Sequence, residues 1–204
     1  MITRNFRAVL AFVVAVSLAS LAMGTDEQLR WELQKARPEG LEAQVLASTM
    51  EKDGPATRLK IVLDYEHGTN PKYPLGWPGC TLKYPDGLDV SGYTTLEGWV
   101  YVSIGDAEAQ GQQQGAVAGQ TLPLPEPAMK LGLRFKGAEK GLDIPIKARL
   151  NTWVKNTISL KQPGAGGALE MAYFYVAESW YKAAGFESGQ EINFYFSGFK
   201  FTNP

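Results

Sequence analysis

Short segments in which apolar and polar residues alternate recur along most of the chain, and no other feature of the sequence restricts its fold as strongly. This alternation is typical of β-strands that bury one face. Residues 58–65 are the clearest example, because Leu59, Ile61 and Leu63 fall on one side. Further strands are predicted at residues 29–33, 41–50, 96–103, 130–136, 144–149, 152–160, 170–176 and 191–201.

Glycine, proline and aspartate separate these segments. Residues 52–54 (Lys-Asp-Gly) favour a tight turn, and Asp89 favours another because its carboxylate can accept backbone N–H bonds from residues two or three positions on. The Pro- and Gly-rich stretch at residues 67–85 is predicted to be a loop. A short helix at residues 26–35 competes with the first strand. Many short strands without a long amphipathic helix predict an all-β fold, either a β-sandwich or a barrel.

The N-terminus has the composition of a cleavable signal peptide. Arg4 and Arg7 are positively charged, residues 8–22 form a run of 15 apolar and small residues, and small residues precede Thr25. The run is shorter than the roughly 20 residues that span a bilayer as a helix. We therefore expect a signal peptide at residues 1–24 and a single domain at residues 25–204. The mature protein is expected to be secreted or periplasmic, without insertion into a membrane.

Charge and cysteine content argue against several functions. The chain has 20 basic and 21 acidic residues and no basic cluster, which argues against nucleic acid or an anionic membrane surface as partner. Cys80 is the only cysteine, so no internal disulfide forms. A catalytic thiol needs a histidine, and His67 is the only one in the sequence. No phosphate-binding loop or dinucleotide fingerprint is present in the sequence.

Two stretches carry a resemblance to a known superfamily. One is Leu88-Asp-Val-Ser-Gly-Tyr-Thr-Thr-Leu-Glu-Gly-Trp-Val-Tyr101, and the other is Phe174-Tyr-Val-Ala-Glu-Ser-Trp-Tyr181 followed by residues 191–201. Together they resemble the galactose-binding-like jelly rolls, which include many carbohydrate-binding modules of secreted polysaccharide-degrading proteins. The resemblance extends over residues 29–204. It implies an antiparallel two-sheet β-sandwich of the jelly-roll type and non-catalytic carbohydrate binding.

The resemblance also bears on metal binding. Such domains often carry an acidic pair in the closing strand, sometimes linked to a structural calcium ion, and this chain has Ser197-Gly198 there. Asp64 and Glu66 remain as candidate oxygen ligands for calcium.

Strand alternation also suggests where a sugar would bind. Aromatic rings stack on the C–H surfaces of sugars, and charged groups beside the rings hydrogen-bond to the hydroxyls. If the apolar residues face the core, one sheet face is predicted to carry these outward residues: Glu97, Trp99, Tyr101, Arg134, Lys136, Tyr173 and Tyr175. The alternative is that a loop such as residues 105–120 covers this face. Tyr73 and Trp77 form a second candidate platform, in a loop.

Two other functions stay open. A glycosidase needs two carboxylates about 5–10 Å apart, and a jelly-roll lyase would use Tyr65 or His67 as its base. Glu178 is expected to anchor a turn instead of acting as an acid. We predict a non-catalytic carbohydrate-binding domain. The alternatives are a structural or protein-interaction module of the cell envelope and a polysaccharide-active enzyme.

Overall fold

The computed structural model describes residues 32–33, 42–68, 72, 74–76, 79–109, 125–162 and 167–203. The expected signal peptide and most of the loop at residues 105–120 lie outside this part of the chain. In the order of the sequence, the elements of the described part are β1 (Glu32–Leu33), β2 (Glu42–Ser48), β3 (Ala56–Val62), β4 (Gly79–Asp89), β5 (Thr95–Ile104), β6 (Met129–Phe135), β7 (Leu142–Ile146), β8 (Val154–Ser159), β9 (Ala168–Val176), α1 (Glu178–Ala183) and β10 (Glu191–Thr202).

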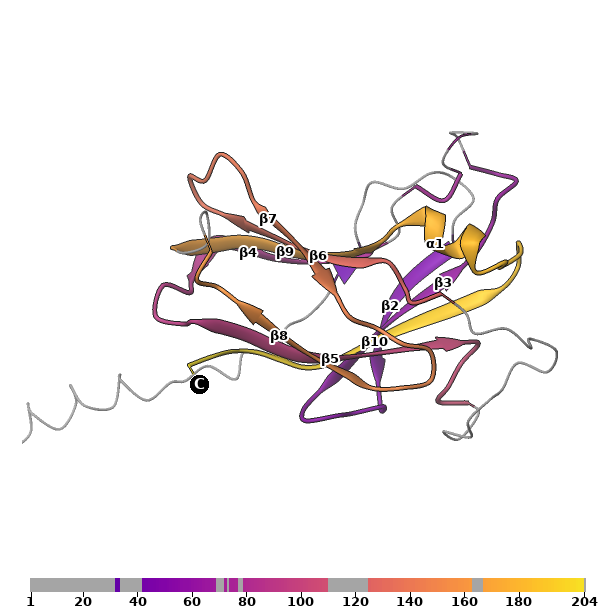
Figure 1. Ribbon diagram of the computed structural model, residues 1–204, viewed down its shortest axis with the longest axis horizontal. Coiled ribbons are helices and arrows are strands. Elements are labelled where there is room, and N and C mark those ends of the chain that lie inside the picture. The colour runs from indigo at the N-terminus through magenta and orange to yellow at the C-terminus, as the bar shows by residue number, and fades with distance from the viewer. Residues whose placement is uncertain are drawn as a thin grey trace, which may run out of the picture.

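The strands pair into two antiparallel sheets that lie one above the other (Figure 1). Sheet A has the order β1-β4-β9-β6-β7, and sheet B has the order β2-β3-β10-β5-β8. The chain passes from one sheet to the other repeatedly, as in a jelly roll, so neighbours in a sheet are mostly distant in sequence. The prediction of an all-β, two-sheet antiparallel sandwich is confirmed. None of the described residues belongs to a helix long and apolar enough to cross a membrane.

The core lies between the two sheets and is rich in aromatic rings. Phe174 of β9 stacks on Phe196 of β10 with ring centroids 4.4 Å apart, and Phe199 meets Phe174 edge-on at 5.2 Å. Each of these rings comes from an inward position of its strand. Burying one large apolar side chain stabilises a fold by about 1.5–3 kcal/mol, so these contacts fix the two sheets against each other and leave their outer faces for other roles.

Two elements differ from the prediction. Residues 79–89 form β4, although the loop was expected to extend to residue 85. The pairing of β4 with β9 shifts register between Lys83 and Leu88, so that Pro85 lies where the ladder is interrupted. A six-residue helix, α1, follows β9 and begins at Glu178. The buried Oε2 of Glu178 accepts hydrogen bonds from the backbone N–H groups of Leu75 and Gly76 (3.0 and 3.1 Å), which confirms its expected role as a turn anchor.

Candidate functional site

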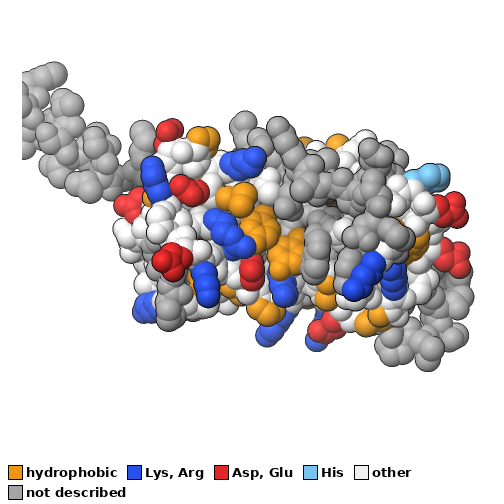
Figure 2. All heavy atoms as spheres, turned by 90° about the horizontal axis from the view of Figure 1, so that it is seen from above, with side chains coloured by type: hydrophobic (Ala, Val, Ile, Leu, Met, Phe, Trp, Pro, Cys, Tyr) orange, Lys and Arg blue, Asp and Glu red, His pale blue; other side chains and the backbone are white. Residues whose placement is uncertain are grey.

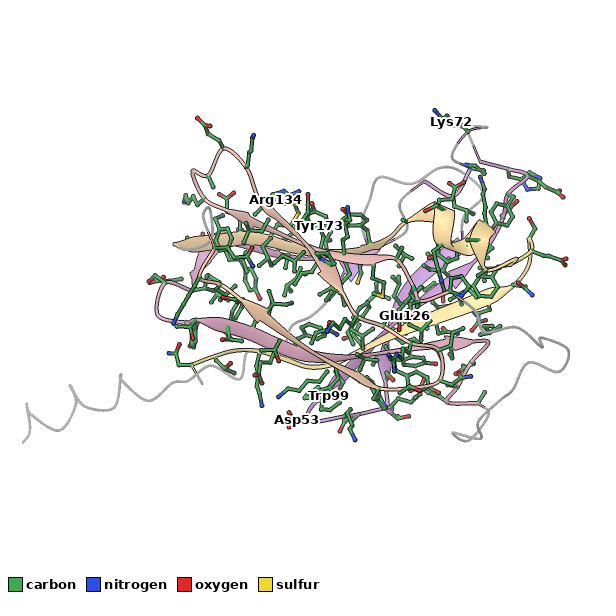
Figure 3. The ribbon with its side chains drawn as sticks, in the orientation of Figure 1. Asp53, Lys72, Trp99, Glu126, Arg134 and Tyr173 are labelled. Carbon is green, nitrogen blue, oxygen red and sulfur yellow. The ribbon has the colours of Figure 1, made fainter. Side chains whose placement is uncertain are left out.

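The predicted ligand-binding residues lie on two sheets instead of one. Glu97, Trp99 and Tyr101 are on β5 in sheet B, whereas Arg134 and Tyr173 are on β6 and β9 in sheet A. All point outward, as the alternation predicted, but the outer faces of the two sheets look in opposite directions. Figure 3 shows Arg134 and Tyr173 on the upper side of the sandwich and Trp99 on the lower side. The prediction of one shared face is therefore wrong, because alternation fixes the side of a strand but not the sheet that the strand joins.

The outer surface of sheet A around Tyr173 and Tyr175, here called the tyrosine face, carries two stacked rings. Their centroids are 5.6 Å apart and their planes differ by 21°. Gly132 of β6 is the register partner of Tyr173, and a Cβ added there would lie only 2.0 Å from the ring atom Cζ. The ring of Tyr173 therefore lies over the β6 backbone, in space that only glycine leaves free.

Arg134 and Asp143 hold the ring of Tyr173 in place. The guanidinium carbon of Arg134 is 4.8 Å from the ring centroid, and its Nη2 donates to Asp143 Oδ1 (3.2 Å) and to the phenol oxygen. The phenol O–H donates in turn to Asp143 Oδ1 at 2.8 Å. The other terminal nitrogen of Arg134 donates to the carbonyl oxygens of Leu133 and Leu142. The arginine is thus tied to the sheet, and the ring is fixed by a cation–π contact and two hydrogen bonds.

The same contacts fix the protonation states of the pair. Burial, followed by the hydrogen bond to Asp143, raises the pKa of Tyr173 to about 12, so the phenol stays neutral. Burial alone raises the pKa of Asp143, but the hydrogen bond from Tyr173 and the charge of Arg134 outweigh it and bring that pKa below its ordinary value. At neutral pH, Asp143 is a charged hydrogen-bond acceptor. Its lowered pKa leaves Asp143 without a proton to donate at neutral pH.

Sequence reasoning missed Asp143 and two lysines of this face. Asp143 is the register partner of Gly132 across the hairpin of β6 and β7, Lys83 pairs with Met171, and Lys130 pairs with Tyr175. The position of Asp143 could have been predicted from the glycine-rich turn at residues 137–141. Pairing residues outward from that turn places Asp143 opposite Gly132 in the hairpin. Figure 2 looks onto sheet A and shows hydrophobic side chains at the surface near its middle, with basic and acidic groups around them.

The outer surface of sheet B around Trp99, Tyr101 and Tyr195, here called the covered face, is closed by the chain itself. The turn between β2 and β3 lies over it: the Lys52 N–H donates to Ser197 Oγ at 2.8 Å, and the Lys52 ammonium lies 5.4 Å from the Trp99 ring centroid. Tyr101 contacts Tyr195 edge-on at 5.7 Å. Tyr195 is fully buried and joins Met50 and Ala107 in a small second core.

A charged cluster fastens residues 106–108 onto the covered face. The Arg58 guanidinium pairs with Asp106 at 2.7 Å and with Glu108 at 3.1 Å. Glu108 also accepts hydrogen bonds from Ser48 Oγ (2.8 Å) and the Thr49 N–H (2.6 Å). The described start of the 105–120 loop therefore covers part of sheet B, as the alternative interpretation expected.

The remaining candidate residues divide between described and undescribed parts of the chain. Glu97 pairs with Lys155 at 3.0 Å on sheet B. Tyr73 and Trp77, the predicted loop platform, lie outside the described residues.

The candidate calcium ligands belong to a turn. Asp64 Oδ1 accepts hydrogen bonds from the backbone N–H groups of Glu66 (2.9 Å) and His67 (3.2 Å), and Asp64 Oδ2 lies 2.7 Å from His67 Nδ1. The hydrogen bond between the two side chains lowers the pKa of Asp64 and raises the pKa of His67. Across the described ranges, no three His, Cys, Asp or Glu residues form a group able to hold a metal ion. The calcium site stays a prediction.

The two candidate bases of a lyase have unsuitable environments. The hydroxyl of Tyr65 is buried without a hydrogen-bond partner among the described residues, and burial together with the charge of Glu178 raises its pKa to about 12. A general base works best with a pKa near the operating pH, so this environment disfavours the phenolate. His67 is exposed and paired with Asp64, which raises its pKa and favours the charged form.

Comparison with known proteins gives structural similarities only. No family model and no curated protein matches the chain. Similar solved structures include an agarase (12% identity, TM-score 0.46, covering 84% of this chain and 23% of the agarase). Modules of a Clostridium thermocellum endo-1,4-β-D-xylanase complexed with xylohexaose are also similar (10%, 0.40, 88% and 29%), as is a family 29 carbohydrate binding module (11%, 0.35, 82% and 87%).

The chain spans less than a third of the agarase and xylanase chains, but most of the binding module. The three identities are 10–12%, and the three TM-scores are below 0.5.

Proposed function

We propose that the protein, after export, binds a polysaccharide through the tyrosine face without catalysing a reaction on it. One observation carries this proposal: two stacked tyrosine rings stand on the outer face of sheet A, and one of them is held there by Arg134 and Asp143. Fixing an aromatic ring in advance lowers the entropy lost when a ligand binds.

The face supplies the two kinds of contact that a sugar needs. The rings of Tyr173 and Tyr175 offer aromatic surface on which the C–H groups of a pyranose can pack. The two hydrogen bonds to Asp143 both use Oδ1, so Oδ2 accepts none from any residue described here and is available to a sugar hydroxyl. Asp143 is 45% exposed, which puts this oxygen within reach of a ligand.

The chemistry of the face favours binding over catalysis. Asp143 is the carboxylate that hydrogen-bonds to Tyr173, whereas Glu170 lies in the bulge of β9 and Asp89 at the end of β4. Glycoside hydrolysis uses two carboxylates that flank the scissile bond. The lowered pKa of Asp143 makes it an acceptor, and Tyr173, with a pKa of about 12, stays protonated. Neither group is tuned to transfer a proton near neutral pH.

Affinity gel electrophoresis of the purified protein against a panel of soluble polysaccharides, with and without calcium, tests the proposal. We expect retardation by at least one polysaccharide and no shortening of its chains. Tyr175→Ala should weaken binding by about tenfold or more. Tyr101→Ala is the matched control, because it removes a half-buried sheet tyrosine from the opposite face.

Two results would count against the proposal. Retention of full affinity by folded Tyr175→Ala would move the site away from the tyrosine face. If no polysaccharide retards the protein, the structural or protein-interaction alternative gains ground. Shortened polysaccharide chains would instead favour an enzyme.

A further inference from the structure

The tyrosine face carries more cations than its internal ion pairs use. Outward positions of β4 and β6 hold Lys83, Lys130 and Arg134, and the carboxylate nearest to the tyrosines is that of Asp143, the register partner of Gly132 on β7. Asp86 and Asp89 are exposed farther along β4, in its bulge and at its end. Glu170 is exposed in the bulge where β6 and β9 shift register.

The covered face is balanced by comparison. All four cations at its outward strand positions have a carboxylate partner: Arg58 with Asp106 and Glu108, Lys60 with Glu191, Lys155 with Glu97, and Lys200 with Asp53. On the tyrosine face, Arg134 pairs with Asp143. Lys83 and Lys130 are both exposed and form no ion pair within 4 Å in the described part of the chain, and Lys130 is near enough to Asp143 for its charge to lower the pKa of that carboxyl. Two ammonium groups are therefore left for a ligand on this face.

The two lysines lie on opposite sides of the tyrosine rings. Lys130 is beside Tyr175 on β6, and Lys83 is beside Met171 on β4, so strand β9 runs between them. They are separated by four positions of β9, about 13 Å along the strand, and by two strand spacings, about 10 Å across it. A chain molecule lying over the tyrosines diagonally would pass both ammonium groups.

We propose that the ligand is an anionic polysaccharide whose carboxylate or sulfate groups pair with Lys83 and Lys130 while its sugar rings lie on Tyr173 and Tyr175. An ammonium group donates hydrogen bonds and accepts none, so its strongest partner on a sugar chain is an anion. Arg134 holds Tyr173 in position, since its donors already serve Asp143, Tyr173 and two carbonyl groups. This inference rests on the proposed function and names the chemical class of the ligand.

Matched polysaccharides that differ only in charge test the inference. Polygalacturonate is compared with its methyl-esterified form, and a sulfated galactan with its desulfated form, so that the carboxylate and sulfate sources are distinguished. We expect at least one anionic form to bind about tenfold more tightly than its neutral partner. That affinity should also fall when NaCl is raised from about 50 mM to about 500 mM, because salt screens exposed ion pairs.

Variants that remove positive charge show which lysines bind the anionic groups of the polysaccharide. Lys83→Gln combined with Lys130→Gln should weaken binding of the anionic form by about tenfold, with little effect on the neutral form. The double variant Lys140→Gln and Lys161→Gln is the control, since it removes the same charge from exposed lysines outside the tyrosine face. It should bind as the unaltered protein does.

The outcomes separate this inference from the function beneath it. The inference is overturned if charged and neutral forms bind equally and neither salt nor the lysine variants change the affinity. That result would still support polysaccharide binding. Binding of neither form of either polysaccharide overturns the inference, and the wider panel then decides on the function. Equally tight binding of duplex DNA or of anionic phospholipid vesicles also overturns it, because the lysines would then act as a non-specific cationic patch.

Discussion

The two outer faces of the sandwich begin from the same sequence pattern and end as different structures. Each presents tyrosines at outward strand positions with charged residues nearby. On sheet B, the turn at residues 49–54 and the segment at residues 106–108 close over the rings and make a second small core. On sheet A, Tyr173 and Tyr175 are half-buried on the outer side of the sheet, and two nearby lysines form no ion pair with a described residue. What distinguishes an open outer face from a second small core is therefore the segment that folds over it.

The largest expected difference between the faces is in stability. Tyr195→Ala on the covered face should lower the free energy of unfolding by about 3 kcal/mol, because it empties a fully buried aromatic site. Tyr175→Ala, on the tyrosine face, should cost less than about 1 kcal/mol. Urea unfolding curves of the two variants measure this contrast, and equal losses would show that the faces do not differ as described.

The next effect concerns the ion pairs that fasten the covering segment. Arg58→Met keeps the apolar stem but leaves Asp106 and Glu108 without their cation, and the carboxylate side chains are 32% and 21% exposed. We expect a loss of about 2 kcal/mol at neutral pH, below the 3–5 kcal/mol of a fully buried pair. Urea unfolding at neutral pH, with the tyrosine-face variants as reference, gives this value.

The same variant has a defined pH dependence. Burial raises the pKa of both carboxyls, but hydrogen bonds outweigh it: those from Arg58 and the backbone lower the pKa of Asp106, and those from Ser48 and Thr49 lower that of Glu108. Their stabilising effect is therefore complete above the unfolded pKa of about 4 and is lost as pH falls through the lower folded values. The difference between Arg58→Met and the unaltered protein should shrink as the pH falls below about 4 and through the lower folded pKa values. A difference that is constant with pH would contradict the ion-pair account.

The smallest expected effect isolates the orientation of one ring. Gly132→Ala places a Cβ 2.0 Å from Cζ of Tyr173, so the ring has to leave its contacts with Arg134 and Asp143. Polysaccharide affinity should fall about tenfold, or about 1.4 kcal/mol, while the stability changes by less than about 1 kcal/mol. Gly92→Ala is the matched control, because a Cβ there meets nothing within 4 Å. Isothermal titration calorimetry distinguishes the two, and unchanged affinity in Gly132→Ala would show that the ring's position does not matter.

Local features of the fold were readable from the sequence. Alternation assigned Val100 and Val102 to the core and Trp99 and Tyr101 to the outside, and the burial pattern of β5 agrees. The turn at Asp89 forms as expected, with its Oδ1 accepting the Ser91 N–H at 2.9 Å. These features depend on a few neighbouring residues, which is why a single sequence contains them.

Non-local features were not readable in the same way. Strand β4 was missed because Pro85 and Gly87 interrupt its alternation, and only its pairing with β9 shows that the chain stays extended there. The division of Trp99 and Tyr173 between two sheets depends on how the chain crosses the sandwich, which alternation does not encode. Asp143 was missed because its role comes from the register of a hairpin and not from a motif.

Chemical-shift mapping of a bound polysaccharide onto assigned backbone amides tests the central claim most directly. We expect the changes to gather on β9, β6 and β4 around Tyr173, Tyr175 and Lys130. Amides of the turn at residues 49–54 and of β5 around Trp99 should stay unchanged. Changes gathered on that turn and on β5 instead, with none on β9, would contradict the assignment of the tyrosine face as the binding surface.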